Sequence, residues 1–274
     1  IVRGSKTMRQ AKSVLVEVNE NLSEHLAMVK ELQEAGFRFK PHQVNQARRK
    51  EGPFKGCAEY LFTKAEDEID RVIERILAAP IQTEPFPYLY LKDVFSPDFY
   101  ERLRANLDVD FEPIAIARNV KGYPERSVHV PVNGFWGGID KLMRDGRLKS
   151  AVCAKFNCYE PVFDDETLLI QDTKGYHLGP HTDTMKKVAS LLFYLPPDER
   201  LSDAGTSIYK PKKEGFTCNG AHHYEFENFD LVRTMPYVPN SLFAFAKTDN
   251  SFHGVEPFTH EGVRNALLYD IRRQ

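Results

Sequence analysis

The stretch GYHLGPHTDTMKKVASLLFYL, residues 175–195, combines a short polar motif with a long apolar run. Residues 188–195 are nearly all apolar and are followed by Pro196 and Pro197, which is typical of a buried β-strand. In the motif, His181 and Asp183 are two residues apart, so on an extended chain both side chains point to one face. The stretch therefore predicts a β-sheet core that carries an imidazole and a carboxylate side by side.

Two further polar residues follow downstream, each beside a strand-like segment. His253 comes after the apolar run 241–246 and the polar turn 248–250, and Arg264 precedes the apolar run 265–271. Two imidazoles and one carboxylate can bind one side of an iron(II) ion and leave its other positions open for oxygen chemistry. A guanidinium can hold a carboxylate through two parallel hydrogen bonds. A lone His-x-Asp pair is a weak signal in a chain with nine histidines, but this order of elements is specific.

With these residues in this order, the chain resembles the iron(II)- and 2-oxoglutarate-dependent oxygenases, in the branch similar to prolyl hydroxylases. The resemblance covers about residues 80–274 and includes an entry segment at 85–95 and the approach 175–180 to the first ligand. It implies a mainly β fold with flanking helices (α+β), built on a double-stranded β-helix (jelly-roll, cupin-like) core. It also implies that His181, Asp183 and His253 bind Fe(II), and that Arg264 holds the distal carboxylate of the cosubstrate 2-oxoglutarate.

The reaction implied by the resemblance consumes 2-oxoglutarate and O2 and hydroxylates a C–H bond, with release of succinate and CO2. Related halogenases carry a small residue where this chain has Asp183, so the carboxylate favours hydroxylation or a related desaturation. Gln171 and Tyr176 lead into the metal-binding strand and are predicted to line the cosubstrate pocket, although the sequence does not show which way they point. The alternative function is a non-catalytic binding or scaffold barrel attached to a methyltransferase. Neither the substrate (a small molecule, a glycan or a peptide) nor the oligomeric state follows from these residues.

The first 64 residues form a separate segment. A strand-like run at 14–18, an apolar stripe at Leu22, Leu26, Val29 and Leu32, and a second strand-like run at 59–62 resemble the end of an FkbM-type methyltransferase domain. The glycine-rich loop that would hold S-adenosylmethionine is absent from the sequence, so no methyltransferase activity is inferred. We expect the natural polypeptide to be longer, with a methyltransferase ahead of the oxygenase. Residues 65–79 are predicted to be a connecting helix before the oxygenase domain at 80–274.

Two regions carry weaker candidates for substrate contacts. Residues 110–149 are rich in glycine and proline and are predicted to be mainly loops. Polar and aromatic residues of this region could contact a substrate, with core or lid packing as the alternative for the two aromatic ones: Arg118, Arg126, His129, Phe135 and Trp136. His222 and His223 are neighbours in sequence and would point to opposite faces of an extended chain, so we expect surface or lid positions.

Composition narrows the remaining classes of function. The net charge of −2 gives no basic excess for binding nucleic acid or an anionic membrane, and no apolar run approaches the ~18 residues of a membrane span. The four cysteines show neither zinc-site spacing nor a dense disulfide pattern, which favours a reducing, cytoplasmic compartment.

Overall fold

A computed structural model describes residues 11, 13–39, 41–64, 68–113, 125–159, 163–220 and 222–274. The chain divides into two compact units, Ile1–Asp67 and Glu68–Gln274. Arg118, one of the candidate substrate contacts, lies outside the described residues. Among the helices that the structure describes, none has both the length and the apolar character needed to span a bilayer.

Within its described residues, the first unit is a three-stranded antiparallel sheet with two helices. The strand order is β1-β3-β2, and the elements are β1 (Ser13–Asn19), α2 (Ser23–Glu34), β2 (Phe37–Arg38), α3 (Pro41–Ala47) and β3 (Cys57–Lys64). Its small core includes Val18, Leu32, Phe37 and Phe62. The strand, helix and strand predicted for this segment are present, whereas its likeness to a methyltransferase stays a prediction.

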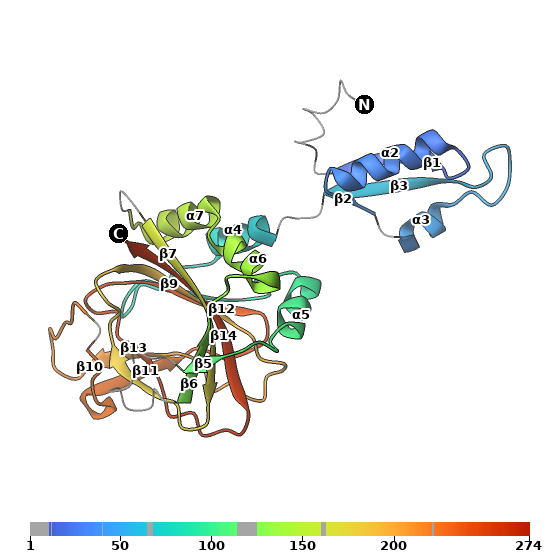
Figure 1. Cartoon of the computed structure of the whole chain (residues 1–274). Coiled ribbons are helices and arrows are strands. Elements are labelled where there is room, and N and C mark those ends of the chain that lie inside the picture. The colour runs from blue at the N-terminus through green and yellow to red at the C-terminus, as the bar shows by residue number, and fades with distance from the viewer. Residues whose placement is uncertain are drawn as a thin grey trace. The chain divides into compact units, whose positions relative to one another are not determined.

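The second unit contains two antiparallel sheets that form a jelly roll (Figure 1). The larger sheet has the order β4-β12-β9-β14-β7-β6-β5 and the smaller one the order β11-β10-β13-β8. The strands are β4 (Tyr88–Lys92), β5 (Glu112–Pro113), β6 (Arg126–His129), β7 (Phe163–Thr173), β8 (Leu178–His181), β9 (Lys187–Tyr194), β10 (Ser207–Pro211), β11 (Phe229–Thr234), β12 (Ser241–Ala246), β13 (His253–Val255) and β14 (Val263–Arg273). The prediction of a mainly β, double-stranded β-helix fold with flanking helices is confirmed.

Alternation along the strands of the larger sheet separates two hydrophobic cores. On β14, Leu267 and Tyr269 join a core shared with the helices, whereas Ala266 joins a core between the two sheets. On β12, Leu242 and Phe243 divide in the same way. Because successive side chains of a strand point to opposite faces, each strand supplies both cores. The polar residues of the site lie on the face that points toward the smaller sheet.

Four helices of the second unit contribute to the core on the outer face of the larger sheet. They are α4 (Glu68–Ala78), α5 (Pro97–Ala105), α6 (Gly134–Met143) and α7 (Gly146–Phe156), and a 3-10 turn, η4 (Phe226–Asn228), precedes β11. Ser96 is the N-cap of α5, and its hydroxyl accepts a hydrogen bond from the Phe99 N–H. Residue 68 onward, including α4, belongs to the second unit, where Ile69, Val72 and Ile76 are buried.

The expectation of a loop-rich region at residues 110–149 is wrong in its second half, where α6 and the start of α7 lie. The sequence of α6 contains three glycines, which made it look like a loop. In the structure it is a helix that buries Trp136, Ile139 and Met143. Gly137 has a packing role, because a Cβ there would lie 2.9 Å from the Val132 carbonyl oxygen. Burial of an apolar stripe therefore outweighs the poor helix propensity of glycine.

Candidate metal centre

His181, Asp183 and His253 meet at the edge of the smaller sheet. His181 ends β8, His253 begins β13, and the two histidines are direct partners in the antiparallel pairing of these strands. Asp183 follows two residues after His181, and one ligand atom from each of the three side chains lies within 4.8 Å of the others. Among the described residues, this is the cluster of histidine, cysteine and acidic side chains that could hold a metal ion.

Backbone hydrogen bonds orient both imidazoles. The Nδ1 atom of His181 lies 3.0 Å from the Gly179 carbonyl oxygen, and Nδ1 of His253 lies 2.9 Å from the Ser251 carbonyl oxygen. A ring whose Nδ1–H donates to a carbonyl presents its Nε2 lone pair to a metal, and such bonds set the tautomer of metal-binding histidines. Burial lowers the pKa of both imidazoles, and the nearby Asp183 carboxylate opposes this only in part. Both rings are therefore held neutral, the form that binds a metal.

Gly254 allows β8 and β13 to approach closely, and Gly179 allows the backbone at Tyr224 to approach β8. A Cβ on Gly254 would lie 2.3 Å from the Leu178 carbonyl oxygen, and a Cβ on Gly179 would lie 2.3 Å from the Tyr224 carbonyl oxygen. Both distances are far shorter than a carbon–oxygen contact, so no larger residue fits without moving the backbone. The glycines next to the ligands therefore have a steric reason.

The Asp183 carboxylate is held by two neighbours. Lys187 Nζ lies 3.0 Å from Asp183 Oδ1, and the Ser190 hydroxyl donates to Asp183 Oδ2 at 3.0 Å. Lys187 Nζ also lies 2.8 Å from Oδ2 of Asp270, a buried residue of β14. Burial raises the pKa of Asp183, but the Lys187 ammonium opposes burial, and the pKa is lowered overall. Conversely, burial lowers the pKa of Lys187, and its two carboxylate neighbours outweigh burial and raise it.

A buried pair of guanidiniums shares one carboxylate on three adjacent strands. Arg264 Nη1 donates to Asp172 Oδ2 at 2.6 Å, while Nε and Nη2 of Arg126 donate to Asp172 at 2.6 and 2.8 Å. Arg264 also donates through Nε to the Ala204 carbonyl oxygen at 2.6 Å. Arg264 and Asp172 are completely buried, and Arg126 is nearly so. Two positive charges against one negative charge leave an excess of +1, which suits a carboxylate ligand.

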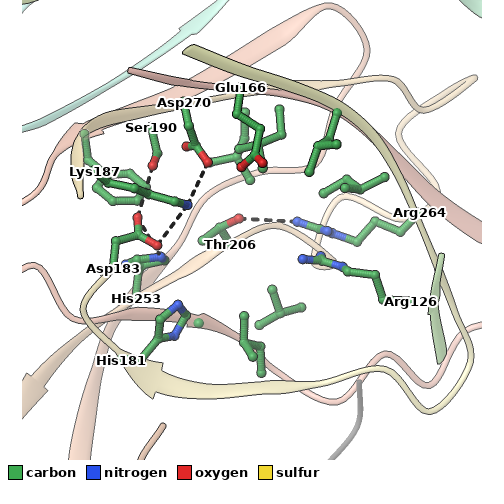
Figure 2. A pocket seen from close by; sticks show the side chains of 18 residues that line it. Arg126, Glu166, His181, Asp183, Lys187, Ser190, Thr206, His253, Arg264 and Asp270 are labelled. Carbon is green, nitrogen blue, oxygen red and sulfur yellow. Dashed lines mark hydrogen bonds and ion pairs between the residues drawn. The ribbon is translucent and has the colours of Figure 1, made fainter. Parts of the chain in front are cut away.

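The three candidate ligands and the two arginines line one cavity of about 200 Å³. Figure 2 shows His181, Asp183 and His253 on one side of it, with Arg126 and Arg264 on the other. Leu168, Ile170, Leu192 and Phe245 form much of the apolar wall. The donor set fits a divalent metal of the iron type, and the arginine side fits the far end of a short dicarboxylate.

The predicted site residues divide into those that line the cavity and those that do not. His181, Asp183, His253 and Arg264 line it, as does Arg126. Gln171 is not among the lining residues; it donates to Asn265 Oδ1 at 3.2 Å. Tyr176 is fully buried beneath Arg126, whose guanidinium carbon lies 4.2 Å from the ring centroid. Direct contact of these two residues with the cosubstrate is therefore without support, and Tyr176 instead packs against an arginine of the cavity.

Apart from Arg126, the weaker candidates that the structure describes lie elsewhere, with one exception. Trp136 is a core residue whose Nε1 donates to the Asn106 carbonyl oxygen at 2.6 Å, and Phe135 packs on the same core. His129 contacts the Asp110 carbonyl oxygen. The exception is His223, which is partly buried and has its ring centroid 4.5 Å from that of His181, although it lies outside the ligand cluster.

Sequence reasoning missed four charged residues in or beside the cavity: Glu166, Asp172, Lys187 and Asp270. Asp172 and Asp270 each lie two positions after an inward-facing apolar residue, Ile170 and Leu268. A carboxylate at an inward position of a buried strand is costly unless it is paired. That period-two pattern is the signal that could have identified both aspartates.

No protein-family model and no curated protein matches the sequence. Among solved structures, an oxidoreductase of the 2OG-Fe(II) oxygenase family from Burkholderia pseudomallei is similar with a TM-score of 0.50 at 14% identity, over 74% of this chain and 90% of that chain. SnoN, a non-heme alpha ketoglutarate dependent epimerase from nogalamycin biosynthesis, has a TM-score of 0.50 at 9% identity, over 73% and 82%. A Pseudomonas putida prolyl-4-hydroxylase has a TM-score of 0.48 at 16% identity, over 75% and 99%. The first two likenesses show that the chain shares the fold of this class of oxygenases.

Proposed function

We propose that the chain is an iron(II)- and 2-oxoglutarate-dependent dioxygenase that hydroxylates a C–H bond. The observation that carries the proposal is the presence of the His181, Asp183 and His253 cluster and of the buried Arg264 in one cavity. A non-catalytic metal-binding scaffold would not need the excess positive charge of the buried Arg126 and Arg264 on the opposite side of the same cavity. The reaction balances as R–H plus 2-oxoglutarate plus O2 giving R–OH plus succinate plus CO2.

Each side chain has a defined task in this proposal. Neutral His181 and His253, with ionised Asp183, would hold Fe(II), which together with 2-oxoglutarate supplies the oxidising chemistry. Arg264 would bind the distal carboxylate of 2-oxoglutarate, while its hydrogen bonds to Asp172 and to the Ala204 carbonyl oxygen keep the guanidinium in place. The apolar wall of the cavity excludes water, which strengthens these charged contacts.

A carboxylate at position 183 supports hydroxylation as the outcome. With Asp183 as a ligand, three side chains would hold the metal, and the site would leave room for 2-oxoglutarate and O2. We infer that the substrate is a small molecule, a glycan or a peptide that reaches the metal through this cavity.

The test begins with ligand binding, because it needs no substrate. We expect the protein to bind Fe(II), or Mn(II) as an air-stable substitute, and the metal-loaded protein to bind 2-oxoglutarate in anaerobic calorimetry. Arg264→Leu should weaken 2-oxoglutarate binding by about 2–5 kcal/mol, the usual effect of removing one partner of a buried charge pair. Arg273→Leu, on an exposed residue of the same strand, is the matched control and should leave binding unchanged.

Turnover is then measured as succinate formed from 2-oxoglutarate in air, with and without candidate substrates. Asp183→Ala should abolish both metal binding and succinate formation, whereas Asp203→Ala, at an exposed carboxylate, should retain them. Absence of Fe(II) binding together with absence of succinate in every mixture would sink the proposal. A non-catalytic barrel predicts instead that Asp183→Ala leaves metal content and ligand binding unchanged.

A further inference from the structure

Lys187 lies between two carboxylates at the metal centre. Its Nζ is 3.0 Å from Oδ1 of Asp183 and 2.8 Å from Oδ2 of Asp270 (Figure 2). The lysine side chain is 19% exposed, Asp183 is 9% exposed and Asp270 is 1% exposed, so water screens these charges weakly. The three groups form a compact unit in which one positive charge faces two negative charges.

The position of Lys187 creates a conflict for metal binding. An ammonium 3.0 Å from a ligand carboxylate competes with a divalent cation for the same negative charge. If Asp183 were the sole partner of Lys187, the pair would be neutral and would attract a metal poorly. Asp270 changes this balance, because it draws the ammonium toward a second carboxylate and restores a net charge of −1 to the unit.

The fold holds Asp270 in this place. Asp270 is paired across the sheet with Glu166 of β7 and Ser190 of β9, and its side chain lines the cavity. The pairing of β9 with β14 shifts register between Ile271 and Arg272, at the end of β9 that carries Lys187. A buried carboxylate needs a compensating charge, and Lys187 supplies it. Asp270 is outside the group of atoms that could contact the metal directly.

We propose that Asp270 is a positioning residue that holds Lys187 and shares its charge, so that Asp183 keeps the negative charge needed to bind a divalent metal. The inference rests on the proposed metal-binding function and deepens it. It makes a prediction about charge count. The net charge of the unit formed by Asp183, Lys187 and Asp270 is −1 in the wild type. It becomes 0 in Asp270→Asn and −2 in Lys187→Met. In the double variant the net charge is again −1.

The experiment measures the affinity for Mn(II) at fixed pH and ionic strength in the full chain, for the wild type, both single variants and the double variant. Asp270→Asn should weaken Mn(II) binding by about 10- to 100-fold, the usual range for partners of metal ligands. Lys187→Met should bind Mn(II) at least as tightly as the wild type. The Mn(II) affinity of the double variant should return to within about threefold of the wild type, because the two substitutions change the net charge by equal and opposite amounts. The effects of substitutions at coupled sites need not add.

A merely structural role predicts a different pattern, in which the two losses add and the double variant binds most weakly. Lys186→Met, at an exposed neighbour of Lys187, is the matched control and should bind Mn(II) like the wild type. If Asp270→Asn does not fold, Mn(II) affinity is still compared between the wild type, Lys187→Met and the double variant. Weaker Mn(II) binding by either variant than by the wild type overturns the inference. Unchanged binding by Asp270→Asn also overturns it. A wild type that binds no Mn(II) refutes the proposed function itself.

Discussion

Asp172→Asn is expected to destabilise the second unit strongly. Asp172 is completely buried, and its carboxylate accepts hydrogen bonds from both Arg264 and Arg126. The asparagine has nearly the same shape, so the change removes a charge without opening a cavity. Its amide group can still accept from one guanidinium, but its NH2 group then faces the other, and two buried cations lose their counter-charge.

The expected loss in free energy of unfolding is about 3–5 kcal/mol, the usual effect of breaking a buried ion pair by removing one partner. The lower end applies if water reaches Arg126, whose side chain is 11% exposed; Arg264 has no such access. A loss of this size is a large fraction of the total stability of a typical domain, which is about 5–15 kcal/mol.

The single tryptophan, Trp136, makes the assay specific to this unit, because it is buried in the core of the second unit. Equilibrium urea unfolding is followed by its fluorescence for the wild type, Asp172→Asn and the control Asp164→Asn, an exposed aspartate of the same strand. The control should lose less than about 0.5 kcal/mol. A loss below about 1 kcal/mol for Asp172→Asn would refute the view that this carboxylate balances two buried cations.

Two further predictions concern the metal site. Gly254→Ala places a Cβ 2.3 Å from the Leu178 carbonyl oxygen, so β8 and β13 must separate and Mn(II) affinity should fall at least about 10-fold; Gly138→Ala, with no atom within 4 Å of its Cβ, should leave calorimetric affinity unchanged. Because burial lowers the pKa of His181 and His253, Mn(II) affinity should stay constant from about pH 8 to about pH 6.5 and decline only below that, where free histidine is already protonated. In the metal-free protein the unfolded chain takes up protons first, so the stability contributed by these neutral rings is present above about pH 6.5 and is lost as the pH falls further. A decline in affinity that begins above pH 7 would contradict the lowered pKa values.

Local patterns in the sequence carried the prediction of buried strands and of a neighbouring imidazole and carboxylate, whereas the jelly-roll fold and the full ligand set were what the family resemblance implied. The His181 and Asp183 spacing, the apolar run that follows it and the order of the later strands depend only on the period of two along an extended chain. The same logic failed for α6, because glycines lower helix propensity locally while the stability of the helix comes from burial of Trp136 and Ile139 against distant strands.

The sequence pattern did not show which face of the sheet each strand side chain occupies. Gln171 was predicted to line the cosubstrate pocket, but the side chains of its neighbours in sequence, Ile170 and Asp172, point inward, and Gln171 contacts Asn265. A shift of one residue in register decides which face a side chain occupies, and register is set by pairing between strands.

The sequence by itself determined which residue types are available for a metal and a carboxylate, since these follow from ligand chemistry and from spacing within single strands. Only the tertiary structure decided how their charges are balanced. Asp172 serves two arginines from neighbouring strands, and Lys187 bridges Asp183 to Asp270, which is 83 positions later in the chain than Lys187. These groups approach because strands β7, β9 and β14 lie side by side in one sheet, and the strength of an interaction between buried charges depends on distance in space.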